Sequence, residues 1–135
     1  MQTDLEQLIS NSLDMAEGLL KELEGEFYPF GGYIDNKGAY KNVGLYEGDD
    51  FPLSETIIDQ LKKYFEREIE SGIIRAYAIA FDCLAKKDET SEKTDTIVIQ
   101  YYSIINGQRA TYYYPYKVNN NNAVDIGEPW AIEGH

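Results

Sequence analysis

The sequence of 135 residues has few of the side chains that most enzymes use. It contains one histidine, His135, and one cysteine, Cys83. A Cys–His or Ser–His pair needs a base held within hydrogen-bond reach of its nucleophile, and a terminal imidazole is badly placed for that. A lone cysteine forms no intramolecular disulfide and no cysteine-rich zinc site, which fits a reducing, cytoplasmic compartment. We therefore expect no catalytic residue, no metal and no cofactor.

Basic residues are also scarce. Twelve Lys and Arg stand against 24 Asp and Glu, giving a formal charge of −12. Nucleic acids and anionic membranes attract proteins mainly through Lys and Arg, so this balance disfavours both as partners. No apolar run approaches the roughly 20 residues of a membrane-spanning helix, and the acidic residues 1–6 are unlike an export signal. The charge leaves room for a basic protein partner.

Apolar spacing predicts two helices. Apolar side chains at three- and four-residue intervals predict a helix over 4–24, and Thr3 and Glu6 have the spacing of a capping box at its start. A second apolar stripe predicts a helix over 55–71, with Ser54 as its N-cap.

The rest of the chain favours strands. Two aromatic-rich segments flank a run of turn-forming residues and predict a hairpin over 27–46. A three-stranded meander is predicted over 73–118. Its first strand carries Ala76, Ala78 and Ala80 on one face, where we expect a helix to pack closely. The C-terminal tail, 119–135, is predicted to be a loop followed by an irregular or short β segment.

The last two strands of the meander flank Asn106-Gly107, a strong signal for a two-residue hairpin turn. Such a turn would place Tyr101 opposite Tyr112 and Ser103 opposite Ala110. One face of this hairpin would then be mostly apolar, while the other would be partly wet. The predicted partly wet face contains Gln100, Tyr102, Arg109, Thr111 and Tyr113.

The predicted element order is α-β-β-α-β-β-β in a single domain, residues 1–135. This order indicates an α+β fold with a five-stranded, mainly antiparallel sheet packed against two helices. It resembles the roadblock and profilin-like domains, which raises the expectation of an interaction module without assigning a function.

Four short strings together point to a family. They are the EFYPFGG segment at 26–32, Arg75-Ala76 leading to Asp82, TDTI at 94–97, and Tyr-Pro-Tyr at 114–116. With these strings, the chain resembles a group of small, uncharacterised bacterial proteins that share the EFYPFG segment. The resemblance spans roughly residues 19–117 and implies a bacterial cytoplasmic setting, but no activity.

The twelve tyrosines, against a single tryptophan, are the most unusual feature of the composition. Tyrosine is enriched at protein interfaces because it offers a large contact area and a hydroxyl at low entropic cost. Tyr102 and Tyr113 beside Arg109 form a candidate interface on the partly wet face. The alternative is an aromatic core on both faces, with hydroxyls that reach its rim.

A second candidate is a pocket near Tyr28, Arg75 and Asp82, with Asp95 as another carboxylate at a strand end. Two carboxylates can perform hydrolysis, but an ion pair at the sheet margin explains the same charges. The aromatic segment 27–33 has two interpretations of its own. It is an edge strand whose rings fill the core, or a binding lip whose glycines admit a ligand.

Three functional hypotheses follow. The first is a non-enzymatic, protein-binding module, for example an immunity protein that neutralises a basic toxin through complementary charge. The second is a small-ligand or hydrolytic pocket near Tyr28, Arg75 and Asp82. The third is a homodimer formed through the sheet, since two helices need not cover both faces of an apolar central strand.

Overall fold

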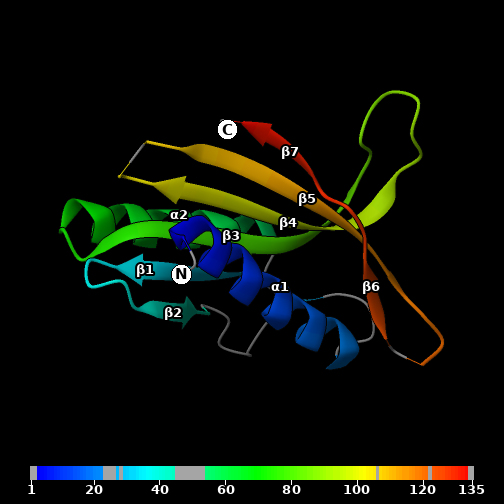
Figure 1. The fold of residues 1–135 in the computed structure, drawn as a ribbon, viewed down its shortest axis with the longest axis horizontal. Helices are drawn as coiled ribbons and strands as arrows, with labels where there is room; N and C mark the ends of the chain where they lie inside the picture. Colours follow the sequence, from blue (N-terminus) through cyan, green and yellow to red (C-terminus); the bar gives the residue numbers. More distant parts are fainter. Residues whose placement is uncertain are drawn as a thin grey trace.

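A computed structural model describes residues 3–22, 27, 29–44, 54–105, 107–121 and 123–133. Figure 1 shows one twisted sheet with α1 on one side and α2 on the other. The elements are α1 (Asp4–Glu22), β1 (Phe30–Asp35), β2 (Tyr40–Val43), α2 (Ser54–Glu70), β3 (Ile74–Ala85), β4 (Thr94–Ser103), β5 (Arg109–Val118), β6 (Val124–Ile126) and β7 (Trp130–Glu133). The α+β class and the two helices are confirmed. Residues 23 and 24, predicted to end the first helix, lie outside the described residues.

Within the described residues the sheet has seven strands, so the predicted number of five is wrong. Its order is β2-β1-β3-β4-β5-β6, with β7 also paired to β5, and every pair is antiparallel. The two additional strands lie in the segment 119–135. They are three and four residues long, and strands this short carry almost no alternation from which to predict them.

The two strands β6 and β7 form one interrupted edge of the sheet. Both pair with β5, β6 near its end at Tyr116–Val118 and β7 at Ala110–Tyr113. On β5, two residues lie between the two pairings. On the C-terminal segment, three residues lie between them. The extra residue bulges at Gly127, whose N–H still donates to the carbonyl of Pro115 at 2.8 Å.

The predicted capping box at the start of α1 is confirmed in one of its two bonds, because the Glu6 carboxylate accepts the Thr3 hydroxyl instead of a backbone N–H. The hydroxyl of Thr3 accepts the N–H of Glu6 at 3.1 Å and donates to the Glu6 carboxylate at 3.1 Å. At the other helix, Gly72 follows the end of α2 with a φ of +76°, a left-handed conformation that glycine adopts without strain.

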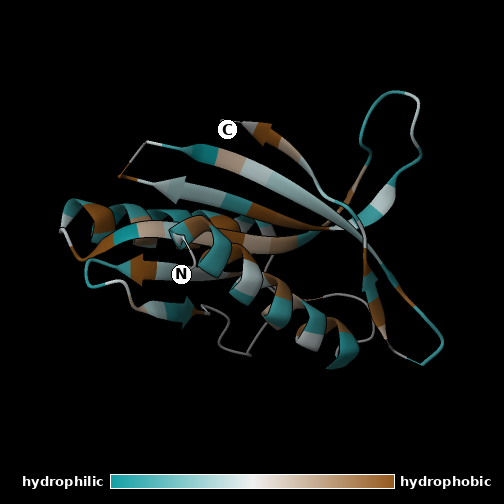
Figure 2. Ribbon diagram, in the orientation of Figure 1, coloured by the Kyte–Doolittle hydropathy of each residue, from teal (hydrophilic) through white to brown (hydrophobic). Residues whose placement is uncertain are grey.

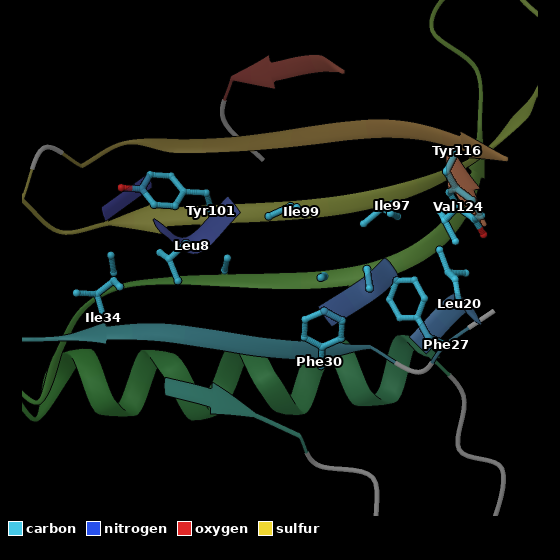
Figure 3. Packing of buried hydrophobic residues seen from close by; sticks show 14 residues of the cluster. Leu8, Leu20, Phe27, Phe30, Ile34, Ile97, Ile99, Tyr101, Tyr116 and Val124 are labelled. Carbon is cyan, nitrogen blue, oxygen red and sulfur yellow. The ribbon is translucent and has the colours of Figure 1, made fainter. Parts of the chain in front are cut away.

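Each helix covers its own face of the sheet. Beneath α1 lie the three alanines Ala76, Ala78 and Ala80, as predicted, and their small side chains let Leu8 and Leu20 pack closely (Figure 3). On the opposite face, Phe65 of α2 lies in a second cluster of buried side chains. Figure 2 shows mostly hydrophobic colour along β3 and hydrophilic colour in much of the loop that joins β3 to β4.

The glycines of β1 admit aromatic rings of the protein itself. A Cβ atom at Gly31 would lie 2.6 Å from the Phe65 ring, and one at Gly32 would lie 2.6 Å from the Tyr40 hydroxyl. The expectation of an edge strand is wrong, because β1 lies between β2 and β3. The Phe65 ring of α2 occupies the space beside Gly31, and the Tyr40 side chain of β2 occupies the space beside Gly32. Neither glycine therefore has room for the ligand that the binding-lip interpretation requires.

The register of the β4–β5 hairpin differs from the prediction by two residues. Tyr101 lies opposite Ala110, and the N–H of Ser103 donates to the carbonyl of Gln108 at 3.0 Å. Four residues, 104–107, therefore connect the strands instead of two. A slip of two residues returns every side chain to the same face, so the hydrophobic pattern could not distinguish the two registers.

Candidate functional site

Among the described residues, the two helices leave part of the sheet without a helix on one side. On the side where α2 packs against β1 and β3, no described helix lies over β4, β5 and β7. Successive residues of a strand point to opposite faces, so the side chains on this side follow from the register. We call this surface the open face; it consists of Val98, Gln100, Tyr102, Arg109, Thr111, Tyr113, Trp130 and Ile132. Arg109 and Ile132 are exposed and the four larger polar and aromatic residues are half-buried, whereas the small side chains of Val98 and Thr111 are buried between them.

An aromatic row connects the open face to the core beneath α2. The Phe65 and Tyr77 rings are stacked, with centroids 4.7 Å apart and an interplanar angle of 13°. The Tyr77 ring lies 5.7 Å from that of Tyr102, and the guanidinium carbon of Arg109 lies 4.0 Å above the Tyr102 ring. Burial raises the pKa of Tyr77, against the opposing influence of nearby Arg109. The row thus ends at the surface in a cation held over an aromatic ring.

A second stacked pair lies farther along β5. Tyr113 and Trp130 are cross-strand neighbours, with ring centroids 5.3 Å apart and planes within 5° of parallel. Beside them on β7, Ile132 is 53% exposed. Tyr and Trp are enriched at the energetic centres of protein interfaces.

None of the eight open-face residues is acidic, although the chain carries 24 Asp and Glu. Arg109 is the single charged residue among the eight, and it forms no ion pair with any described carboxylate. The Oε1 atom of Gln100 is buried and has no hydrogen-bond partner among the described residues. An unsatisfied buried acceptor costs free energy, and this oxygen is enclosed by the protein itself.

A shallow hollow of about 320 Å³ continues the open face towards β6. Thr94 and Pro115, which line it, lie on the same side as Val98 and Tyr113 because each is an even number of residues away along its strand. The complete lining is Thr94, Pro115, Tyr116, Lys117, Asp125, Ile126 and Gly127.

The predicted interface residues share one surface. Tyr102 and Arg109 are in direct contact, and Tyr113 lies four residues from Arg109, roughly 13 Å along β5. Sequence reasoning missed Trp130 and Ile132, which come from the segment predicted as a tail. Their two-residue spacing was the available signal.

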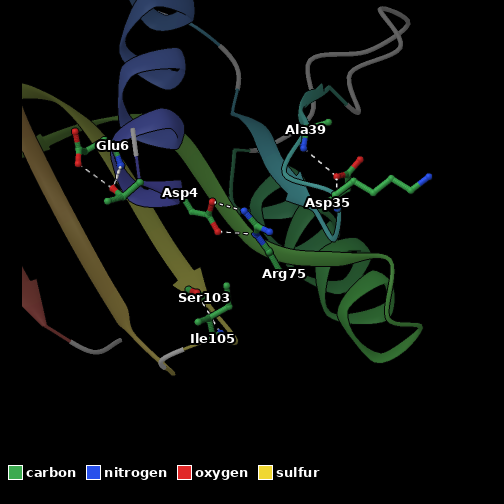
Figure 4. Close-up of polar contacts among 9 residues, drawn as sticks. Asp4, Glu6, Asp35, Ala39, Arg75, Ser103 and Ile105 are labelled. Atoms are coloured by element: carbon green, nitrogen blue, oxygen red, sulfur yellow. Dashed lines mark hydrogen bonds and ion pairs between the residues drawn. The ribbon is translucent and has the colours of Figure 1, made fainter. Parts of the chain in front are cut away.

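The predicted pocket residues are spread out. Arg75 makes two contacts of 2.8 Å with the carboxylate of Asp4 in α1 (Figure 4), and this hydrogen bonding raises its pKa. Asp82 accepts the hydroxyl of Tyr116 at 2.8 Å. Asp82 follows Arg75 by seven positions along β3, a distance of roughly 23 Å. Asp95 is exposed opposite Leu84.

Tyr28, the remaining predicted pocket residue, lies outside the described residues.

A bulge explains why Arg75 reaches α1. Ile34 pairs with Ala76, whereas Asp35 pairs with Ile74, so Arg75 is an extra residue of β3. It turns towards the α1 side together with Ala76.

Within the described ranges, no three His, Cys, Asp or Glu side chains gather where they could hold a metal ion. Neither described helix combines the length and apolarity needed to cross a bilayer.

In comparisons with protein-family models, curated proteins and solved structures, nothing matches this chain. The resemblances to the EFYPFG group and to roadblock and profilin-like domains therefore stay predictions.

Proposed function

We propose that this protein is a non-enzymatic, cytoplasmic binding protein that holds a basic protein partner on its open face. The observation that carries the proposal is an acid-free aromatic surface on a chain of charge −12. Interface centres are depleted of charge and enriched in Tyr, Trp and Arg, while their rims are polar. Four of the eight open-face residues, Tyr102, Arg109, Tyr113 and Trp130, are of these types, and they lie on either side of the middle row formed by Gln100, Thr111 and Ile132.

Charge supports the choice of partner. Oppositely charged surfaces accelerate association and exclude wrong partners. After burial, the charge of Glu66 in α2 also raises the pKa of Tyr77 at one border of the open face. At the other border, Asp125 lines the hollow opposite the cation Lys117. A partner with basic residues around an apolar centre fits this arrangement. A bacterial immunity protein that neutralises a basic toxin is one concrete form of the proposal.

A hydrolytic or ligand-binding pocket near Tyr28, Arg75 and Asp82 has no comparable support. Arg75 and Asp82 bind different elements, and neither faces the other.

Two matched substitutions test the proposal. Ile132→Asp places a carboxylate on the open face, whereas Leu84→Asp does so at a residue of similar exposure, 59% against 53%, on the opposite side of the sheet. Tagged wild type and both variants are used to capture partners from cells of the source organism. We expect one basic protein to be recovered with wild type and Leu84→Asp and lost with Ile132→Asp, and the pair to re-form from purified components. Recovery that Ile132→Asp leaves unchanged, or no recovery by wild type, contradicts the proposal.

A further inference from the structure

The open face is about as wide as one helix. α2 lies on the neighbouring strands β1 and β3. Strands are about 4.8 Å apart and a helix is about 10 Å across, so one helix covers about two strand spacings. The next three strands, β4, β5 and β7, span about 10 Å on the same side. This width matches a second helix beside α2.

We propose that the open face receives an amphipathic α-helix of the basic partner, lying alongside α2 with one large apolar side chain in the hollow at Pro115. This inference rests on the proposed function and specifies which element of the partner binds.

The location of the site argues for a helix and against an extended segment. The backbone groups of β4 and β5 are already paired within the sheet, so the open face offers side chains only. An extended segment lying on it would leave its own N–H and C=O groups without partners, whereas a helix satisfies them internally. The free edge of β7 is only four residues long and follows Pro129, and such edges pair poorly with another strand.

The dimensions and the side chains fit the same occupant. From Arg109 to Lys117 the open face and its hollow extend over eight residues of β5, roughly 26 Å. A helix of about 17 residues has this length. Its apolar stripe would cover Tyr113, Trp130 and Ile132, and basic residues on its flanks would meet the carboxylates at the two borders, Glu66 and Asp125. A second copy of this chain would bring another charge of −12 instead, and repulsion between the copies opposes that arrangement.

Trp130 provides a direct reporter, because it is the only tryptophan and lies on the open face. The first probe is a synthetic peptide of about 18 residues, built from Leu and Lys with leucine at helical spacing. The second has the same composition but alternates Leu and Lys, the pattern of a strand. Both are titrated against the purified full chain, its Ile132→Asp variant and its Leu84→Asp variant, with circular dichroism confirming that each variant is folded.

We expect the helical peptide to shift Trp130 emission to shorter wavelength and to saturate with wild type and Leu84→Asp. In Ile132→Asp its affinity should fall about tenfold or more, because a buried carboxylate is unfavourable. The alternating peptide should give no saturable shift. Equal binding of both peptides, equal binding to all three proteins, or no binding of the helical peptide overturns the inference.

Two measurements separate this inference from the proposed function. Light scattering that finds a wild-type dimer and an Ile132→Asp monomer places a second copy on the open face, which also overturns the inference. Capture of the cellular partner decides the proposed function independently of the peptides. If Ile132→Asp abolishes capture while the alternating peptide binds best, the function stands and the helical occupant is wrong.

Discussion

Arg109 and Tyr102 are cross-strand neighbours whose side chains stack, with the guanidinium carbon 4.0 Å from the ring centre. The same tyrosine ring contacts Tyr77, which is itself stacked on Phe65 of α2. Arg109 is exposed, yet its position is fixed by rings that extend into the core. An arginine oriented in this way loses little additional entropy when a partner binds it.

The first prediction is that Arg109 and Tyr102 are energetically coupled. In a double-mutant cycle with Arg109→Ala and Tyr102→Leu, we expect a coupling free energy of about 0.5–1 kcal/mol, the usual magnitude for an exposed cation–π pair. Urea unfolding gives the four free energies. Lys117→Ala replaces Arg109→Ala in the control cycle. Lys117 is an exposed cation on the same strand, but it lies opposite Asp125 of β6 and not opposite Tyr102. Equal coupling in both cycles would show that the stacked geometry contributes nothing.

The second prediction concerns the ion pair between Asp4 and Arg75. Its two 2.8 Å contacts join the first turn of α1 to the bulge of β3, and the side chains are only 18% and 29% exposed. We expect Asp4→Asn to lower the free energy of unfolding by about 1–2 kcal/mol, since partly buried charged hydrogen bonds are stronger than exposed ones. Chemical denaturation at neutral pH measures the change.

The exposed ion pair Glu17–Lys21, at 3.5 Å within α1, is the matched control. Glu17→Gln should change stability by less than about 0.5 kcal/mol. Comparable losses for Glu17→Gln and Asp4→Asn would mean that the partial burial of the Asp4–Arg75 pair has no energetic consequence.

The faces of the sheet could be predicted from the sequence, while its pairings could not. The alternation around Ala76, Ala78 and Ala80 identified the side that α1 covers. The turn signal at Asn106-Gly107 suggested a two-residue connection, but the structure pairs Ser103 with Gln108. The N–H of Ile104 also donates to the carbonyl of Arg75. Pairing between distant strands thus competes with local turn preference, and a single sequence pattern does not reveal which prevails.

The candidate site was predictable only in part, for a similar reason. Tyr102, Arg109 and Tyr113 share a face because β4 and β5 alternate regularly. Trp130 and Ile132 join them through a bulge at Gly127, and a bulge shifts the register without changing composition. The predicted pocket failed for a different reason: Arg75 and Asp82 lie seven residues apart on β3, and the bulge at Arg75 turns its side chain to Asp4 of α1.

The third prediction tests the close approach of α2 to β1. A Cβ atom at Gly31 would lie 2.6 Å from two carbons of the Phe65 ring, which is fully buried. Gly31→Ala should therefore destabilise the protein by about 1–3 kcal/mol, the cost of overpacking a core. Gly18→Ala is the control, since nothing lies within 4 Å of its Cβ position in α1.

Opposite signs are expected for the two glycine substitutions. Alanine has the higher helix propensity, so Gly18→Ala should stabilise by about 0.5–1 kcal/mol. Melting temperatures from calorimetry should thus move in opposite directions. A stable, unshifted Gly31→Ala protein would mean that the Phe65 ring moves aside without cost.

The last prediction is a dependence of stability on pH that comes from the β1–β2 turn. The Asp35 carboxylate accepts the N–H of Ala39 at 2.9 Å and that of Lys37 at 2.8 Å (Figure 4). The bond from Ala39 is the main reason why the pKa of Asp35 lies below its ordinary value of 3.8; partial desolvation opposes it, and Lys37 adds to it. A carboxylate with a lowered folded-state pKa stabilises the protein above the unfolded-state pKa and loses that contribution as pH falls through the folded-state value.

The stability difference between wild type and Asp35→Asn should therefore be constant from about pH 7 to pH 5 and shrink as the pH falls towards 3. Denaturant unfolding at each pH gives this difference. Gly38→Ala strains the same turn, because Gly38 has a φ of +89°, without adding or removing a titrating group. Its cost of about 1–2 kcal/mol should be the same at every pH. If the Asp35→Asn difference also stays constant down to pH 3, the two backbone hydrogen bonds do not favour the charged form of Asp35, and the turn owes its stability to backbone conformation alone.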